Sequence, residues 1–146
     1  MQTVTVKSLE ELSGVAQAIL DSYTPREGAF VIALSGELGV GKTAFVKELA
    51  KHLGIGHEIT SPTFVIMKSY TIPHNAHFNT LVHIDAYRIE TDDEMRVLGL
   101  GAILSDASKI VCIEWPEKIA DLIPKDAYPV TLVIEKGDIR TISYGS

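Results

Sequence analysis

The chain has 146 residues, of which 46% are hydrophobic and 22% charged, and its formal net charge at neutral pH is −6. A chain of this length is expected to form a single domain, residues 1–146, that buries about 70% of the surface exposed when it is unfolded. The acidic balance argues against direct binding of nucleic acid, because neutralising phosphates needs clustered Lys and Arg side chains. Any role that involves RNA is therefore expected to be indirect.

The cysteine content and the first residues bear on the compartment. Cys112 is the only cysteine, so the chain forms no internal disulfide, as is typical of a reducing compartment. The first residues, MQTVTVKSLEE, lack the pattern of a secretory signal or a transit peptide, and no run of apolar residues is long enough to span a membrane. We expect a soluble, cytoplasmic protein with no membrane association.

The beginning of the chain predicts a strand, a helix and a second strand. Thr3–Val6 alternates like a short strand, and the capping-box pattern SLEE at Ser8 is typical of a helix start. Pro25–Gly28 ends that helix, and the apolar run Phe30–Leu34 predicts a buried strand. The apolar residues that share one face of the helix are Leu9, Leu12, Ala16, Ile19, Leu20 and Tyr23.

Residues 36–43, GELGVGKT, have the GxxxxGKT pattern of a phosphate-binding P-loop. The pattern follows a predicted strand and precedes a helical segment, Ala44–Leu53, which is the context in which it forms a P-loop. Glycines at 36, 39 and 41 let several backbone N–H groups face one anion, and the next helix adds the positive end of its dipole. Lys42 is then placed to reach the β- and γ-phosphates, and the Thr43 hydroxyl to bind Mg²⁺.

Strands alternate with short helices in the rest of the chain. The predicted strands are Phe64–Tyr70, Leu81–Tyr87 and Ile110–Ile113. A second capping box, TDDE at Thr91, opens a helix through Leu98, and Pro116 precedes a helix over Glu117–Leu122. Val130–Glu135 and Ile139–Ser143 form a predicted hairpin. The order predicts an α/β fold: a P-loop NTPase-like sheet with helices on both faces and a C-terminal β-hairpin.

Two predicted strands end in a carboxylate, Asp85 after LVHI and Glu114 after IVCI. Ligands bind at the carboxyl ends of the strands in doubly wound sheets, so either residue is a candidate for the Mg²⁺ carboxylate. The alternative for each is a carboxylate that caps the following loop. The P-loop earlier in the chain favours the catalytic interpretation.

Three further residues have two interpretations each. Thr63, in the segment TSPTF, follows the P-loop helix where switch proteins sense the γ-phosphate through a hydroxyl, although Ser-Pro-Thr is also a common turn. Trp115 either stacks on the base or ribose or packs at a helix start. Arg88 pairs either with a phosphate or a partner's carboxylate, or with a local acid such as Glu90.

The segments GELGVGKT, TSPTF, HIDAYR and IEWPE, in this order and in a short chain, resemble the TsaE (YjeE) family of small bacterial P-loop ATPases. The resemblance runs from about Ser8 to about Lys125. It implies a protein that works with TsaD and TsaB in threonylcarbamoyladenosine modification of tRNAs that read codons starting with adenine. Its ATP hydrolysis would reset that complex between rounds while TsaD carries out the transfer, so contact with tRNA would be indirect.

The resemblance also implies roles for single residues. Thr43 and Glu114 would hold Mg²⁺, Asp85 would lie near the attacking water, and Thr63 would be the switch threonine. The start of the first helix, at Ser8 and Leu9, would lie near the adenine of ATP or ADP. The predicted nucleotide-binding residues are Gly36, Gly39, Val40, Gly41, Lys42, Thr43, Ala44 and Trp115.

We therefore expect a Mg²⁺-dependent ATPase, slow alone, with Lys42, Asp85 and Thr63 as catalytic residues. A small-molecule kinase is one alternative, but kinases of this size close an arginine-bearing lid, and the few arginines here are scattered along the chain: Arg26, Arg88, Arg96 and Arg140. A nucleotide-sensing protein with negligible catalysis shares every motif, and only a turnover measurement separates it from an ATPase.

Overall fold

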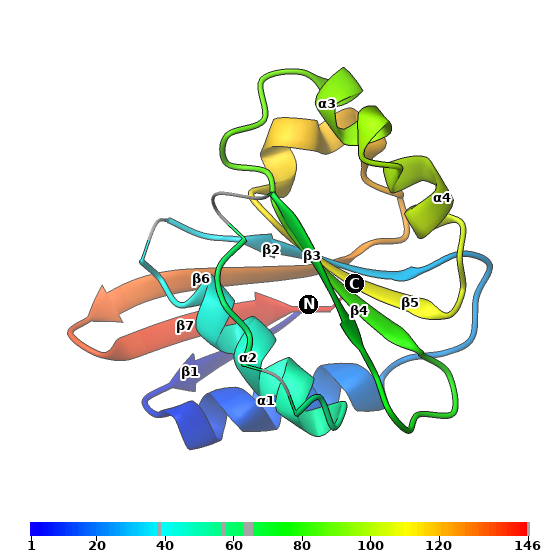
Figure 1. The fold of residues 1–146 in the computed structure, drawn as a ribbon. Helices are drawn as coiled ribbons and strands as arrows, with labels where there is room; N and C mark the ends of the chain where they lie inside the picture. Colours follow the sequence, from blue (N-terminus) through cyan, green and yellow to red (C-terminus); the bar gives the residue numbers. More distant parts are fainter. Residues whose placement is uncertain (38, 57, 63–65, 146) are drawn as a thin grey trace.

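A single mixed β-sheet forms the centre of the computed structural model, which describes all residues except 38, 57, 63–65 and 146. Within the described residues its strands lie in the order β1-β7-β6-β2-β5-β4-β3 (Figure 1). The neighbours β6, β2, β5 and β4 are parallel, while β7, β1 and β3 run antiparallel to their neighbours. The strand bounds are Gln2–Val6 (β1), Phe30–Ser35 (β2), Met67–Thr71 (β3), Thr80–Asp85 (β4), Lys109–Glu114 (β5), Tyr128–Lys136 (β6) and Ile139–Tyr144 (β7).

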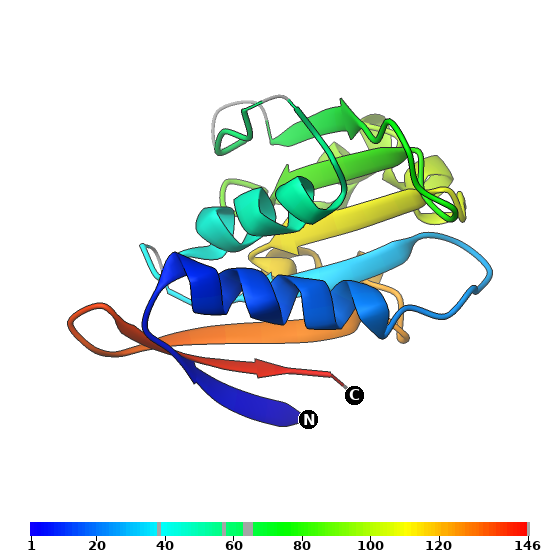
Figure 2. The same ribbon diagram turned by 90° about the horizontal axis from the view of Figure 1, so that it is seen from below.

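Helices cover both faces of this sheet. On one face α1 (Leu9–Asp21) and α2 (Lys42–His52) lie side by side (Figures 1 and 2). On the other lie α3 (Asp92–Val97), α4 (Leu100–Leu104) and the 3₁₀ helix η1 (Pro116–Leu122) (Figure 1). The predicted α/β sheet with helices on both faces and a C-terminal hairpin, here β6 and β7, is confirmed. No helix among the described residues is long and apolar enough to cross a membrane.

The central strands are mostly apolar because both of their faces are buried. Phe30 and Ile32 of β2 pack into the cluster under α1 and α2, while Val31 between them packs into the cluster on the opposite face. Successive side chains of a strand point to opposite faces, so a strand covered on both sides needs no polar alternation. This is why the uninterrupted apolar runs of the sequence mark the middle of the sheet.

Three elements differ from the sequence prediction. Gly99, at φ +81°, ends the helix that begins after Thr91, but the chain resumes as α4, because a left-handed glycine breaks a helix without preventing another turn. The helix after Trp115 is 3₁₀, with a non-helical residue at Ile119. The strand predicted from Phe64 begins at Met67 in the structure, and residues 64 and 65 lie outside the described part.

The start of α1 is capped by side chains on both sides of the turn. The Ser8 hydroxyl accepts a hydrogen bond from the Glu11 amide at 3.1 Å, as the capping box predicts. The Glu11 carboxylate accepts from the amide of Lys7 at 2.6 Å, one residue earlier than in an ordinary capping box. Both residues of the link between β1 and α1, Lys7 and Ser8, are therefore hydrogen-bonded to Glu11 in the first turn of the helix.

The parallel register brings three chain segments to one edge of the sheet. Leu34 of β2 pairs with Glu114 of β5, which pairs in turn with Asp85 of β4. The P-loop leaves β2 immediately after this point. The two acids predicted from separate strands are thus neighbours, beside the start of α2.

Candidate nucleotide-binding site

The P-loop backbone passes through left-handed conformations that favour glycine. Gly39 has φ +79° and Gly41 has φ +106°. Gly41 is the N-cap residue of α2, so no side chain covers the first amides of that helix. Free amides and the positive end of the helix dipole make such a terminus an anion site.

Gly36 has a different role, because it lies against β6. A Cβ atom on Gly36 would lie 2.7 Å from the Leu132 carbonyl oxygen and 2.8 Å from Cγ1 of Val40. A Cβ on Gly39 or Gly41 would meet no described atom within 4 Å. Gly36 therefore lets the P-loop pass close to the neighbouring strand, while the other two glycines shape the turn around the anion.

A cavity of about 240 Å³, which we name the P-loop cavity, opens at this edge of the sheet. It joins the start of α2 to the ends of β4 and β5. Gly36 and Val40 belong to the P-loop but do not line this cavity, and Thr63 lies outside the described residues. The lining residues are Gly39, Gly41, Lys42, Thr43, Ala44, Ser61, Asp85, Glu114 and Trp115.

Lys42 is buried, with 4% of its surface exposed. Its Nζ donates a hydrogen bond to the Gly36 carbonyl at 2.6 Å and lies 3.6 Å from the centre of the Trp115 ring. Burial lowers the pKa of Lys42, and the negative charges of Glu114, Asp85 and Glu117 oppose this shift. The ammonium group is thus held at the cavity by a carbonyl and an aromatic face.

Glu114 is the acid that connects the P-loop to the sheet. Its Oε2 accepts a hydrogen bond from the Thr43 hydroxyl at 3.2 Å and lies 2.5 Å from Nε2 of His83. Glu114 is 5% exposed. The predicted metal ligands Thr43 and Glu114 are therefore in direct contact.

The donor set of this cavity fits Mg²⁺. Thr43 supplies a hydroxyl oxygen, and Glu114 and Asp85 supply carboxylate oxygens, the ligand type that hard cations prefer. Among the described residues, no group of three or more His, Cys, Asp and Glu side chains is arranged to hold a metal ion. In proteins Mg²⁺ usually takes one or two protein ligands together with phosphates and water.

Asp85 lies in the same cavity, buried at the end of β4. Its Oδ1 accepts a hydrogen bond from the Tyr87 amide at 3.0 Å, which fixes the turn after the strand. The Tyr87 ring contacts the Trp115 ring at a centroid distance of 4.9 Å. Trp115 itself has a left-handed backbone, φ +58°, directly before η1. Trp115 therefore lies between Lys42 and the Tyr87 ring, and of the two aromatic residues only Trp115 lines the cavity.

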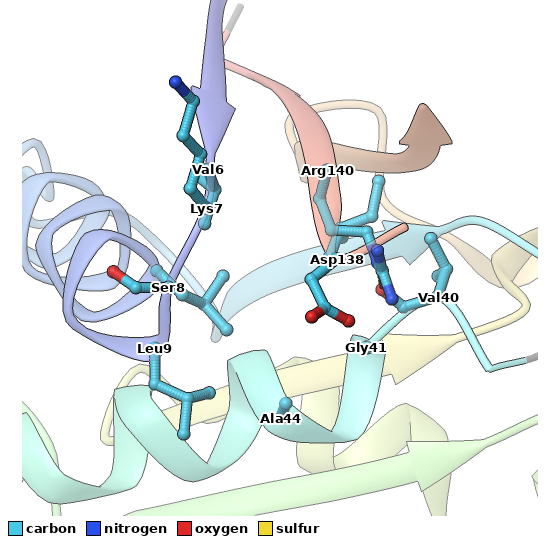
Figure 3. Close-up of a pocket in the computed structure, with 11 residues that line it drawn as sticks. Val6, Lys7, Ser8, Leu9, Val40, Gly41, Ala44, Asp138 and Arg140 are labelled. Atoms are coloured by element: carbon cyan, nitrogen blue, oxygen red, sulfur yellow. Dashed lines mark hydrogen bonds between the residues drawn. The ribbon is translucent and has the colours of Figure 1, made fainter. Parts of the chain in front are cut away.

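A second, larger cavity of about 330 Å³ lies on the other side of the start of α2, and we name it the hairpin cavity (Figure 3). Figure 3 shows Ser8 and Leu9 on one side of it, Asp138 and Arg140 of the hairpin on the other, and Ala44 at its floor. Gly41 and Ala44 line both cavities. The two cavities therefore meet at the first turn of α2.

The hairpin also holds the P-loop directly. Nε of Arg140 donates a hydrogen bond to the Val40 carbonyl at 3.1 Å, and its Nη1 donates to the Gly137 carbonyl at 2.8 Å. Sequence reasoning missed Asp138 and Arg140 because they lie far from the P-loop along the chain and carry no motif. Only the pairing of β7 with β1 brings them to the start of α1.

Sequence reasoning also missed His83. Its signal was present, since His83 stands two residues before Asp85 on a strand, and alternate residues of a strand share a face. His83 is polar in an otherwise apolar buried strand and lies on the same face as the candidate catalytic acid Asp85. That combination indicates a contact within the site.

A sheet whose central strand leads through GxxxxGKT into a helix, with acids at the ends of the next parallel strands, defines the P-loop nucleotide-binding proteins. This chain has the fold and the site of that class.

The family follows from comparison with known sequences. The family model described as "Threonylcarbamoyl adenosine biosynthesis protein TsaE" matches residues 6–142, and the chain belongs to this family. It is 36% identical over 140 residues to the tRNA threonylcarbamoyladenosine biosynthesis protein TsaE of Rickettsia bellii, an alignment that covers 95% of this chain and 90% of that relative. The protein of the same name from Bacillus subtilis is 35% identical over 135 residues, covering 92% and 79% of the two chains.

A solved structure agrees with this assignment. The crystal structure of YdiB from Bacillus subtilis matches with a TM-score of 0.75 at 25% identity, over 98% of this chain and 83% of that chain. The resemblance inferred from four short motifs is confirmed. The chain is a member of a family involved in the biosynthesis of threonylcarbamoyladenosine in tRNA.

Proposed function

We propose that this protein binds ATP with Mg²⁺ and hydrolyses it slowly, as a switch that resets a TsaD and TsaB complex between rounds of tRNA modification. The observation that carries the proposal is the pair of cavities that meet at Gly41 and Ala44. One is built for phosphate and the other is lined mostly by apolar side chains. A nucleoside triphosphate likewise consists of a charged triphosphate joined to a largely apolar base by a ribose.

In this proposal the triphosphate occupies the P-loop cavity and the nucleoside the hairpin cavity. Leu9, Leu12 and Val6 supply apolar contacts for an adenine ring, consistent with the expectation that the start of the first helix lies near the base. Ala44 has no hydroxyl to offer the α-phosphate, so its backbone amide is the group available there. ADP, the product, would occupy the same two cavities.

Lys42 supplies the charge that faces the β- and γ-phosphates. To do so its Nζ exchanges the Gly36 carbonyl and the Trp115 ring for phosphate oxygens, which solvate an ammonium group better than a carbonyl and a ring do. Thr43 and Glu114 hold Mg²⁺, which when bound supplies positive charge against the phosphate oxygens. Asp85, on the adjoining strand, orients the attacking water, and Thr63 reports the γ-phosphate to the partner surface.

Slow turnover alone follows from the charges of the site. Lys42 is the only cationic side chain among the described residues that line the P-loop cavity. P-loop hydrolases with a single lysine at the phosphates are slow until an arginine or a partner adds charge at the transition state. Coupling to TsaD and TsaB would supply the missing charge. In this proposal the protein acts in the cytoplasm and contacts tRNA only through the complex.

The test is phosphate release from ATP, measured with and without purified TsaD and TsaB and with GTP as a control. We expect slow release alone, a several-fold rise with the pair, and none from a Lys42→Ala variant. Lys47→Ala is the matched control, because Lys47 lies on the exposed side of the same helix. Undiminished turnover in Lys42→Ala would rule the scheme out.

Two other outcomes would replace the proposal. Phosphate that moves onto a small acceptor, with no response to TsaD and TsaB, would indicate a kinase. Tight ATP binding without turnover under any condition would indicate a nucleotide-sensing protein.

A further inference from the structure

His83 is a fully buried histidine in contact with the candidate metal ligand. None of its surface is exposed, and its Nε2 lies 2.5 Å from Oε2 of Glu114. Its Nδ1 is buried and has no hydrogen-bond partner among the described residues. The contact with Glu114 is therefore the polar interaction that holds this side chain in the core.

The chemistry of the two groups sets the direction of this hydrogen bond. A carboxylate oxygen accepts hydrogen bonds, so the donor in this contact is Nε2–H of His83. His83 is thus a donor aimed at one oxygen of Glu114.

Both described hydrogen bonds to Glu114 fall on the same oxygen. Oε2 accepts from His83 and, at 3.2 Å, from the hydroxyl of Thr43. Two donors on one oxygen, from β4 and from α2, determine the rotation of the carboxylate. This arrangement leaves Oε1 as the oxygen available to a metal ion or to a water bound to it.

The neighbour of His83 on β5 is apolar, so an apolar side chain would pack well at this position. In the register of β4 and β5, His83 pairs with Cys112, which is buried in the cluster under α1 and α2. An aliphatic residue would pack there without leaving a polar nitrogen unpartnered, a cost that an imidazole carries. The bond to Glu114 is what offsets this cost.

We propose that His83 is a positioning residue that holds Glu114 in the orientation needed for the Mg²⁺ of the bound nucleotide. This inference rests on the proposed function, since it takes Glu114 as a ligand of that ion. Groups that orient metal ligands by hydrogen bonds change metal affinity by about 10- to 100-fold when they are removed. His83 acts through Glu114 and does not touch the nucleotide.

The variants His83→Gln and His83→Met separate positioning from packing. The amide nitrogen of Gln stands as many bonds from the backbone as Nε2 of His, so it can donate to Glu114. Met has similar length and no donor. His83→Asn keeps the amide but is one carbon too short, and it serves as the non-donating variant if His83→Met does not fold.

The measurement is the affinity for ADP by calorimetry, with and without Mg²⁺, on the full chain. Mg²⁺ should increase the affinity for ADP by about 10- to 100-fold less in His83→Met and His83→Asn than in the unsubstituted chain. The affinity for ADP without Mg²⁺ should be unchanged in both variants. His83→Gln should keep most of the gain.

Two results would overturn the inference in distinguishable ways. If the non-donating variants respond to Mg²⁺ as strongly as the unsubstituted chain, His83 has no positioning role and the proposed function stands. If the unsubstituted chain binds ADP equally with and without Mg²⁺, the inference and the Mg²⁺ part of the proposed function fail together.

Discussion

Replacing Gly36 by Ala should destabilise the fold more than any other single methyl group added to the P-loop glycines. The new Cβ would overlap the Leu132 carbonyl oxygen at 2.7 Å and Cγ1 of Val40 at 2.8 Å. Overpacking of this kind costs about 1 to 3 kcal/mol. The backbone adds a further cost of roughly 1 to 3 kcal/mol, because φ at Gly36 is +150°, which L side chains rarely adopt.

The total, about 2 to 6 kcal/mol, is large against the stability of about 5 to 15 kcal/mol typical of small domains. Gly39→Ala is the matched control. Its φ of +79° is also unfavourable, but its Cβ meets no described atom within 4 Å, so it should cost only about 1 to 2 kcal/mol.

Urea unfolding followed by circular dichroism gives both free energies of unfolding. We expect Gly36→Ala to have the lower midpoint with an unchanged slope. Equal midpoints for the two variants would refute the reasoning, because they would show that β6 does not constrain the P-loop at Gly36.

Four further predictions concern single residues. Lys42→Met should raise the free energy of unfolding at pH 7, because burial lowers the pKa of Lys42 in the folded state and the charged side chain therefore costs stability at that pH. Urea titrations should show this increase in stability shrinking as the pH rises through the folded-state pKa toward 10.5. Trp115 is the only tryptophan and contacts Lys42, so saturating ATP and Mg²⁺ should change its fluorescence emission, and constant emission would contradict the placement of phosphate at Lys42. Burial and the charge of Glu114 raise the pKa of the Cys112 thiol, so a thiol reagent at pH 8 should label it only after urea is added. Ser8→Ala should lower the free energy of unfolding by about 1 kcal/mol through loss of the helix cap, as measured by urea titration.

The parts of the site that the sequence predicted are those whose signals are local. GxxxxGKT identifies its own turn because its glycines and lysine are adjacent in the chain. Asp85 and Glu114 were predictable as neighbours because each ends a buried parallel strand, and the register places the two side by side. The structure brings Lys42, Thr43, Asp85 and Glu114 together, but the roles of these residues and of Thr63 stay predictions.

The parts that were not predicted depend on contacts across the fold. His83 meets Glu114 only through the pairing of β4 with β5, and Asp138 reaches the hairpin cavity only through β7. The reason for glycine at position 36 is equally non-local, since the nearest atom belongs to β6. The second helix after Gly99 was missed because a glycine signals a helix end and carries no information on the next element of the chain.

The pairing of β1 with β7 has a consequence for the newly made chain. Val6 pairs in register with Arg140, so the two walls of the hairpin cavity come from opposite ends of the described chain. At ordinary rates of translation the ribosome takes roughly 7 to 27 s to travel from one to the other. Until β7 has been made, the nascent protein has the P-loop but not the hairpin cavity. If the base of ATP occupies that cavity as proposed, ATP would stabilise only a domain in which β7 is already paired, and it could not assist folding before that point.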